Sequence, residues 1–262
     1  MLTAHVDGRA IEYRMIPGDV VSRPTLVFLH EGLGCAALWR DFPDKVAGRL
    51  GARTLVYSRF GYGASDGLPG KREPGFMHEE ALHVLPRLLD RLGVDAPVLV
   101  GHSDGASIAL IHAGLAQRPV TGVAVLAPHV FVEQVTVDSI ADIRAKYLSA
   151  GHEASGLRTR LSRYHARVDD AFLGWADIWL DPRFRDWSIE DAIPSIAAPV
   201  LVVQGRQDEY GTLAQLDRIA QAARVPVTRL ELDACGHAPH RDQEQAVIDA
   251  IVTFVQGLAV AG

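Results

Sequence analysis

The 262-residue sequence has few cysteines, no basic run and no long apolar stretch, and each of these absences argues against a class of protein. Its two cysteines, Cys35 and Cys235, are too few for a disulfide framework, which favours a reducing compartment. The net charge of -6, with no cluster of lysine and arginine, argues against a nucleic-acid partner held through its phosphates. No apolar stretch approaches the length of a membrane span, so no membrane partner is expected.

The first residues also lack the features of a secretory signal. Residues 1–5 have neither a charged region nor an apolar core, and we therefore expect a cytoplasmic protein. A hydrophobic content of 48% and a charged content of 22% are ordinary for a folded globular chain. The length suits one large α/β domain, with or without an insertion.

Short apolar runs alternate with helical patterns along most of the chain. Residues 3–7 and 11–16 alternate apolar and polar positions and predict an opening hairpin. Continuous apolar runs predict buried strands at 25–29, 53–58, 98–101, 122–127 and 199–205, and a further strand is predicted at 227–232. Helical spacing predicts helices at 38–50, 77–92, 106–116, 213–223 and 243–258. This alternation predicts an α/β fold with a mostly parallel sheet and helices on both faces.

The alternation breaks between residues 131 and 196, which have helical patterns and contain Trp175, Trp179 and Trp187. The segment leaves the carboxyl end of a predicted strand, where ligands bind in parallel sheets, and a long connection without strands is usually functional. We therefore expect a core domain made of residues 1–130 and 197–262, and a helical cap made of residues 131–196. The alternative is a helical layer that packs away from the site.

The pentapeptide Gly-His-Ser-Asp-Gly at residues 101–105 lies between a predicted strand and a predicted helix. This is the G-x-S-x-G pattern in the setting that it requires. Its glycines remove the Cβ atoms that would collide where a strand turns abruptly into a helix. The pattern predicts a nucleophile elbow that exposes Ser103; the alternative is a serine that only caps the helix.

A serine nucleophile needs a base, and the base needs an acid. His237 lies in the loop after the predicted strand at 227–232, and we favour it over His240, which we expect at the start of the last helix. Asp208 follows the strand at 199–205 and precedes His237 in the chain, as the acid should, with the adjacent Glu209 as its alternative. These positions predict a triad of Ser103, His237 and Asp208.

An acyl transfer also needs backbone N–H groups that stabilise the oxyanion. One donor is expected from Asp104, which follows the predicted nucleophile. The second is expected in the glycine-rich loop after residue 29, from Leu33 or, as the alternative, Gly32. The alternative is that this loop is a tight turn whose glycines serve compactness alone.

These motifs together resemble those of the α/β-hydrolase superfamily over essentially the whole chain. The resemblance rests on residues 30–34, 61–65 and 101–105, on Asp208, and on Gly236 and His237. It implies an eight-stranded sheet with a helical cap inserted after the sixth strand, the predicted triad and no cofactor. Serine at position 103, where dehalogenases and epoxide hydrolases of the family have aspartate, implies acyl chemistry through an acyl-enzyme.

Two residues depart from the family pattern. Glu31 stands where glycine is common, and Asp104 stands where an apolar residue or an amide is common. A carboxylate that faces the pocket would repel an anionic substrate and oppose the oxyanion. Either the two carboxylates turn away or pair with a cation such as Arg59, or the site prefers neutral or cationic substrates. Matched neutral and carboxylated esters would distinguish the two interpretations.

We expect a serine hydrolase that cleaves a small ester, thioester or related acyl compound. Its substrate is expected to contact Glu31, His129, Trp175 and Trp179. No metal site is expected, because the histidines near this edge of the sheet lack metal-ligand spacing. The alternatives are hydrolysis of a carbon–carbon bond in a ring-cleavage product, an aminopeptidase-like activity, and a non-catalytic ligand-binding protein. The assembly state is left open, with a homodimer as one option.

Overall fold

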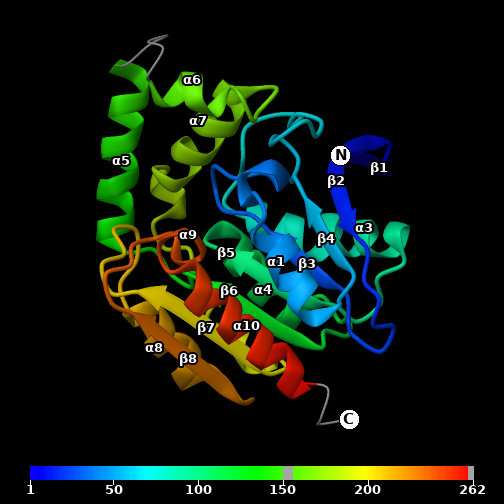
Figure 1. Ribbon diagram of the computed structural model, residues 1–262. Coiled ribbons are helices and arrows are strands. Elements are labelled where there is room, and N and C mark those ends of the chain that lie inside the picture. The colour runs from blue at the N-terminus through cyan, green and yellow to red at the C-terminus, as the bar shows by residue number, and fades with distance from the viewer. Residues whose placement is uncertain (150–155, 259–262) are drawn as a thin grey trace.

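A computed structural model of the protein describes residues 1–149 and 156–258 and contains one eight-stranded sheet (Figure 1). Its strands are β1 (Leu2–Val6), β2 (Arg9–Ile16), β3 (Leu26–Leu29), β4 (Thr54–Tyr57), β5 (Val98–His102), β6 (Gly122–Leu126), β7 (Val200–Gly205) and β8 (Val227–Leu232). The strand order is β1-β2-β4-β3-β5-β6-β7-β8. β2 pairs antiparallel with β1 and β4, and all other neighbours are parallel. The predicted α/β fold with a mostly parallel eight-stranded sheet is confirmed.

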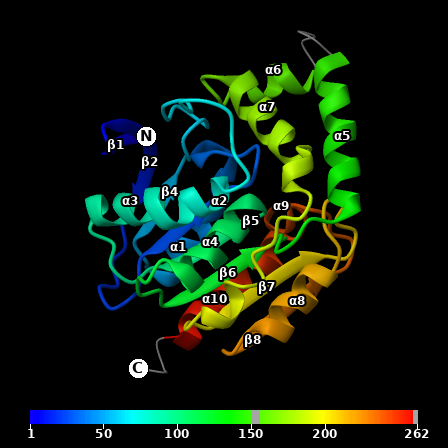
Figure 2. The same cartoon turned by 180° about the vertical axis from the view of Figure 1, so that it is seen from behind.

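Helices cover both faces of the sheet (Figures 1 and 2). Side chains of β3 alternate between the two faces, with Leu26 and Phe28 in one apolar cluster and Val27 and Leu29 in the other. The first cluster is completed by α1 (Phe42–Leu50) and α10 (Glu244–Leu258). The second is completed by α3 (Leu85–Leu92), α4 (Asp104–Leu115) and α8 (Ala214–Ala222). Burial on both faces explains why the central strands are apolar throughout.

The helix predicted at 77–92 is broken into three parts. α2 (Phe76–Glu79) continues through a π-helical turn (Glu80–Val84) into α3. Pro86, near the start of α3, has no N–H to donate to a carbonyl of the preceding turn, which favours the wider turn there. The short helix α9 (Pro239–Asp242) contains His240 and precedes α10 rather than starting it.

The residues between β6 and β7, at positions 131–196, form what we call the helical insert. It contains α5 (Gln134–Ser149), α6 (Leu157–Leu161), α7 (Val168–Trp179) and two short 3-10 turns (Pro182–Phe184 and Ile193–Ser195). α5 and α7 stand beside the loops that follow β5, β6 and β7, whereas α6 lies farther from the sheet (Figures 1 and 2). Residues 150–155 of the expected cap and residues 259–262 of the expected core lie outside the described ranges.

Residues 157–168, part of the segment with helical patterns, do not form one continuous helix. α6 ends at Leu161, and the chain then turns inward until α7 begins at Val168. The cause is His165, whose Nδ1 accepts a hydrogen bond from Gly63 N (3.0 Å) while its Nε2 donates to Leu33 O (3.0 Å). These contacts tie the insert to two loops of the core. None of the helices in the described ranges has the length and apolarity that crossing a membrane requires.

Candidate active site

Ser103 lies at the turn between β5 and α4 with backbone angles of φ 53° and ψ -119°, which are strained for a residue with a side chain. The two glycines that flank it have no room for a Cβ atom. A Cβ on Gly101 would lie 2.3 Å from Gly105 O, and one on Gly105 would lie 2.1 Å from Leu29 O. The strand and the helix therefore meet closely enough to hold the Ser103 side chain at the end of the sheet.

The structure brings Ser103, His237 and Asp208 into direct contact. His237 Nε2 is 2.9 Å from Ser103 Oγ, and His237 Nδ1 is 2.9 Å and 3.0 Å from the two carboxylate oxygens of Asp208. The Asp208 side chain is fully buried, and that of His237 is 14% exposed. The three residues come from the loops after β5, β7 and β8. This arrangement allows the imidazole to take the serine proton while the carboxylate fixes its orientation.

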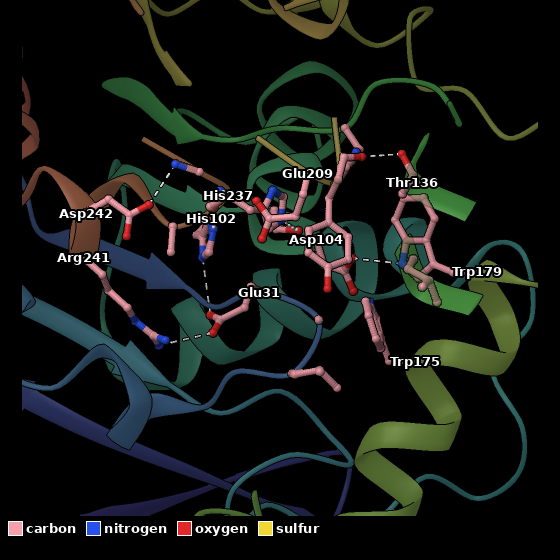
Figure 3. Close-up of a pocket in the computed structure, with 18 residues that line it drawn as sticks. Glu31, His102, Asp104, Thr136, Trp175, Trp179, Glu209, His237, Arg241 and Asp242 are labelled. Atoms are coloured by element: carbon pink, nitrogen blue, oxygen red, sulfur yellow. Dashed lines mark hydrogen bonds and ion pairs between the residues drawn. The ribbon is translucent and has the colours of Figure 1, made fainter. Parts of the chain in front are cut away.

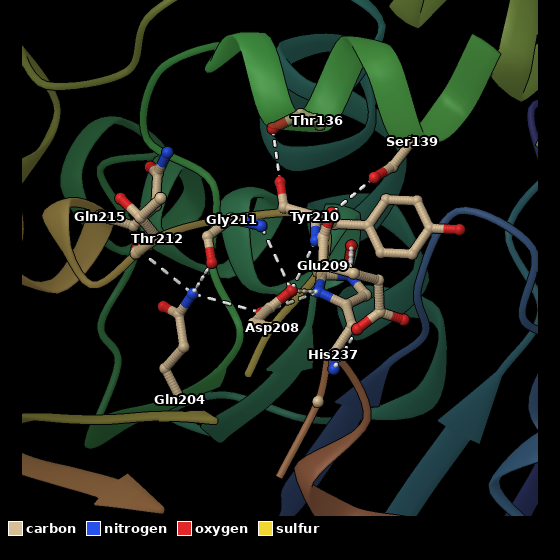
Figure 4. Close-up of polar contacts among 12 residues, drawn as sticks. Thr136, Ser139, Gln204, Asp208, Glu209, Tyr210, Gly211, Thr212, Gln215 and His237 are labelled. Carbon is tan, nitrogen blue, oxygen red and sulfur yellow. Dashed lines mark hydrogen bonds and ion pairs between the residues drawn. The ribbon is translucent and has the colours of Figure 1, made fainter. Parts of the chain in front are cut away.

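Asp208 is held as a carboxylate by several donors (Figure 4). Its Oδ1 accepts hydrogen bonds from Tyr210 N (2.8 Å) and Gly211 N (3.2 Å), and its Oδ2 accepts one from Gln204 Nε2 (3.2 Å). Burial raises the pKa of Asp208, but the hydrogen bond and charge of His237 outweigh it and hold the pKa below its usual range. Asp208 is therefore ionised at neutral pH.

Helix α5 of the insert also holds the loop that contains Asp208. Thr136 Oγ1 donates to Tyr210 O, and Ser139 Oγ donates to Glu209 O at 2.6 Å (Figure 4). These two hydroxyls were not among the residues expected from the sequence. Their only signal was a position near the start of a helical pattern, which does not indicate a partner some 70 residues away.

A cavity of about 450 Å³ opens beside Ser103 (Figure 3). All four residues expected to contact a substrate line it, namely Glu31, His129, Trp175 and Trp179. The insert contributes Thr136 and Ile140 in addition to the two tryptophans. Trp187 is not part of the wall and instead stacks on Phe184.

The expected oxyanion donors border the same cavity. Gly32, Leu33 and Asp104 all line it. A Cβ on Gly32 would lie 2.1 Å from Trp175 Nε1, so a glycine is needed where this tryptophan closes on the loop. Asp104 is the first residue of α4, and its N–H therefore has no acceptor within the helix.

Glu31 and Asp104, the two departures from the family pattern, both line the cavity and both face a cation. Asp104 Oδ1 accepts a hydrogen bond from Trp179 Nε1 (3.2 Å), and its Oδ2 is 3.7 Å from Arg59 Nη2. Burial raises the pKa of Asp104, although the charge of Arg59 partly offsets the rise. Arg59, the cation expected from the sequence, is therefore a partner of Asp104.

Glu31 is connected to the loop of His237 through His102. Its Oε2 is 3.6 Å from His102 Nδ1, and its Oε1 is 3.7 Å from Arg241 Nη2. His102 Nε2 donates a hydrogen bond to His237 O at 2.6 Å. Burial raises the pKa of Glu31, but His102 and Arg241, which face the carboxylate, outweigh that effect, so the pKa lies well below its usual range. This role of His102 was not predicted from the sequence.

The described ranges contain no group of three or more histidine, cysteine or acidic residues that could hold a metal ion. His30 uses both ring nitrogens within the protein. Its Nδ1 donates to Glu31 O (2.7 Å), and its Nε2 accepts a hydrogen bond from Arg59 N (3.0 Å). The two cysteines are buried as free thiols.

Buried His129 makes the stability of the protein pH-dependent. Burial lowers its pKa to about 3, so the folded protein keeps this ring neutral at a pH where the unfolded chain binds a proton. Stability is therefore lost as the pH falls below the ordinary histidine pKa of about 6.5. Between pH 8 and pH 5 we expect His129 to account for a loss of about 2 kcal/mol.

The variant His129→Phe tests this expectation, because phenylalanine keeps the ring contact with Trp179 but does not titrate. The free energy of unfolding is measured in urea at pH 8 and pH 5 for both proteins. The other titrating groups are shared, so the variant should lose about 2 kcal/mol less than the wild type. Equal losses in the two proteins would contradict the assignment.

Comparison with known proteins places this chain in a hydrolase family. The family model described as the alpha/beta hydrolase family matches residues 26–250. A proline iminopeptidase from Lactobacillus delbrueckii subsp. lactis is 29% identical over 100 residues, which are 38% of this chain and 34% of that protein. The match thus spans about a third of this curated relative.

Two solved structures are similar over nearly their whole length. The enol-lactonase from Burkholderia xenovorans is 21% identical with a TM-score of 0.75, and the match covers 97% of this chain and 100% of that one. A meta-cleavage product hydrolase from Pseudomonas fluorescens is 16% identical with a TM-score of 0.73, and the match covers 98% of each chain. At these identities the likeness concerns the fold.

Proposed function

Because this chain belongs to the alpha/beta hydrolase family, we propose that it is a serine hydrolase that cleaves a small ester, thioester or related acyl compound. The observation that carries the proposal is the contact of Ser103 with His237, and of His237 with Asp208, beside a cavity large enough for a small substrate. Hydrolase families of this fold vary in substrate, so the site rather than the fold supports the choice.

The reaction proceeds in two steps. Ser103 Oγ attacks the substrate carbonyl carbon while its proton passes to His237 Nε2, and the tetrahedral intermediate collapses as this proton moves to the leaving group. The acyl group is then bonded to Ser103. A water molecule gives a proton to His237, attacks the acyl carbon and releases the acid, and the proton returns to Ser103. Asp208 accepts a hydrogen bond from Nδ1–H throughout and stabilises the imidazolium.

The oxyanion of each tetrahedral intermediate is held by backbone N–H groups. Asp104 supplies one donor and Leu33 the second, with Gly32 as the alternative second donor. Preorganised N–H groups at this position are worth about 3 kcal/mol each in related chemistry. Arg59 and Trp179 face the Asp104 carboxylate and thereby reduce its repulsion of the oxyanion.

The helical insert acts as a cap over the site. Trp175, Trp179 and Ile140 give the cavity an apolar wall opposite Ser103, and this wall suits the acyl part of a substrate. The hydroxyls of Thr136 and Ser139 couple the same helix to the loop of Asp208. The cap would thus shape the substrate cavity and support the acid at once.

A series of p-nitrophenyl esters with increasing acyl length tests this function. We expect kcat/KM to be highest for short or medium acyl chains, and to fall once the chain outgrows the cavity of about 450 Å³. The rate of p-nitrophenol release is measured against the Ser103→Ala variant. Release no faster than with that variant for every ester would refute the proposal.

The partial match with a proline iminopeptidase favours one second candidate, the removal of an N-terminal residue from a peptide. In that reaction the acyl group carries the substrate ammonium, and Glu31 is the carboxylate of the cavity wall that we assign to it. L-proline p-nitroanilide is assayed beside the ester series. A higher kcat/KM for the anilide than for any ester would favour this candidate.

A further inference from the structure

We propose that the rim of the cavity binds a positively charged group on the leaving-group side of the substrate, between the carboxylates of Glu209 and Asp242. The inference rests on the proposed acyl-hydrolase function and narrows its substrate class to esters or thioesters with a cationic leaving group. It is separate from the second candidate, in which the charge lies on the acyl side.

The two carboxylates converge on the loop that contains His237. Glu209 Oε2 accepts a hydrogen bond from His237 N (3.2 Å), and Asp242 Oδ2 accepts one from Gly236 N (2.9 Å). A Cβ atom on Gly236 would lie 3.0 Å from Glu209 Oε2 and 3.4 Å from Asp242 Oδ2. The absence of a side chain at Gly236 thus lets both carboxylates approach the same stretch of backbone, and both residues line the cavity (Figure 3).

The charges of Glu209 and Asp242 are not neutralised by the part of the chain that the structure describes. No basic side chain in residues 1–149 and 156–258 lies within 4.0 Å of either carboxylate. Arg241, the arginine of the cavity wall, instead lies 3.7 Å from Glu31 and donates to Leu38 O at 3.2 Å. The rim thus carries two negative charges with no cation of its own.

A buried acceptor deeper in the cavity favours the same charge on a ligand. The Asp104 side chain is 1% exposed and lines the cavity, and its Oδ2 has no hydrogen-bond partner among the described residues. Arg59 faces it only at 3.7 Å. His129 adds no positive charge to the wall, because burial keeps its ring neutral. Buried acceptors without donors are costly, and a cationic substrate would reduce that cost.

The position of the rim fixes which part of the substrate would carry the charge. The leaving group takes its proton from His237 Nε2, so it departs past this residue. Glu209 accepts a hydrogen bond from the backbone N–H of His237, and Asp242 accepts one from that of Gly236. Tyr210, whose ring centre is 4.8 Å from that of His237, lines the cavity beside them and offers an aromatic face to a cation.

Two esters of the same acid test the inference, the choline ester and its uncharged isostere, the 3,3-dimethylbutyl ester. The acid is the one that the p-nitrophenyl series selects, and acid release is followed by titration at low salt. We expect kcat/KM for the choline ester to exceed that for the isostere by about tenfold, the effect of two partly exposed ion pairs. In the double variant Glu209→Gln, Asp242→Asn, whose amides can still accept the two backbone hydrogen bonds, the ratio should fall to about one.

The control is Asp95→Asn, which removes an exposed carboxylate from the turn before β5 and should keep the wild-type ratio. A second measurement needs no variant, because added NaCl screens exposed charges and should lower the wild-type ratio. Hydrolysis of both esters with a ratio of one or less in the wild type, or a ratio that survives the double variant, would overturn the cation site and leave the hydrolase intact. Hydrolysis of neither ester, with the p-nitrophenyl ester of the same acid still hydrolysed, would likewise overturn the cation site, whereas failure of the whole p-nitrophenyl series would overturn the hydrolase.

Discussion

Replacing Ser103 by alanine is expected to lower kcat for the best p-nitrophenyl ester by about 10⁶-fold, to little above the uncatalysed rate that binding and the oxyanion donors still accelerate. Alanine cannot form the acyl-enzyme, and His237 Nε2 then has no hydroxyl at 2.9 Å to deprotonate. The folded state should survive, because the side chain that is removed is small and the strained backbone at this position remains.

Ser107→Ala is the matched control for this variant. Ser107 lies one turn later in α4, and its Oγ donates to His129 O at 2.6 Å without lining the cavity. Its loss should cost about 1 kcal/mol of stability and leave kcat close to the wild-type value. Initial rates are compared at equal concentrations of folded protein. Activity within tenfold of the wild type in Ser103→Ala would contradict the assignment of the nucleophile.

Asp208→Asn is expected to lower kcat by about 10⁴-fold. Tyr210 N and Gly211 N both donate to Oδ1, so the amide oxygen of asparagine must take that position. The NH₂ group then replaces Oδ2, where it faces His237 Nδ1 at 3.0 Å and the Gln204 amide at 3.2 Å. The amide oxygen at the Oδ1 position still lies 2.9 Å from Nδ1, but the N–H beside it repels Nδ1–H and can itself donate to Nδ1. That donation favours the tautomer with its proton on Nε2, which cannot accept the proton of Ser103, and the neutral amide no longer stabilises the imidazolium.

The rate loss of Asp208→Asn is measured as kcat/KM. The urea midpoint of unfolding is measured as well, because the Gln204 amide would face a second donor and some stability should be lost. Asp95→Asn, the same chemical change at an exposed turn, is the control and should retain activity. Glu209 is adjacent to Asp208 in the chain and is the alternative acid. A loss of less than tenfold in Asp208→Asn would indicate that another group orients His237.

The buried strands and the turn at residues 101–105 were predictable, because both depend on residues that lie near one another in the chain. The apolar runs of the parallel strands follow from burial on both faces, and the glycines at 101 and 105 follow from the steric limits of the turn. The positions of Asp208 and His237 were predictable because loops after parallel strands meet at one edge. The structure places these side chains within hydrogen-bond distance of one another.

Contacts between distant segments could not be predicted. The turn at His165 replaces a helix because its imidazole finds Gly63 N and Leu33 O, two partners that only the folded chain brings near. The link from Thr136 to the loop of Asp208, and the position of His102 between Glu31 and the His237 carbonyl, have the same origin. Helical spacing reports which face of a segment is apolar, but not which polar group a side chain will meet.

The pairing of the two unusual carboxylates shows the same limit. The sequence allowed Glu31 and Asp104 either to turn away or pair with a cation, or to shape substrate choice. The structure shows that both line the cavity while each faces a cation. A carboxylate of this site can therefore pair with a cation and still line the cavity. The buried Arg59 side chain, for example, faces Asp104 without lining the cavity itself.

Reaction with a fluorophosphonate tests the central claim most directly, because this reagent bonds to a serine only where a neighbouring base activates its hydroxyl. The protein is incubated with the reagent, and intact and peptide mass spectra locate the adduct. We predict a single adduct on Ser103, formed at least about 100-fold more slowly in a His237→Ala variant, which lacks the base. An unmodified Ser103 in the folded wild-type protein, or an adduct at another residue, would contradict the account.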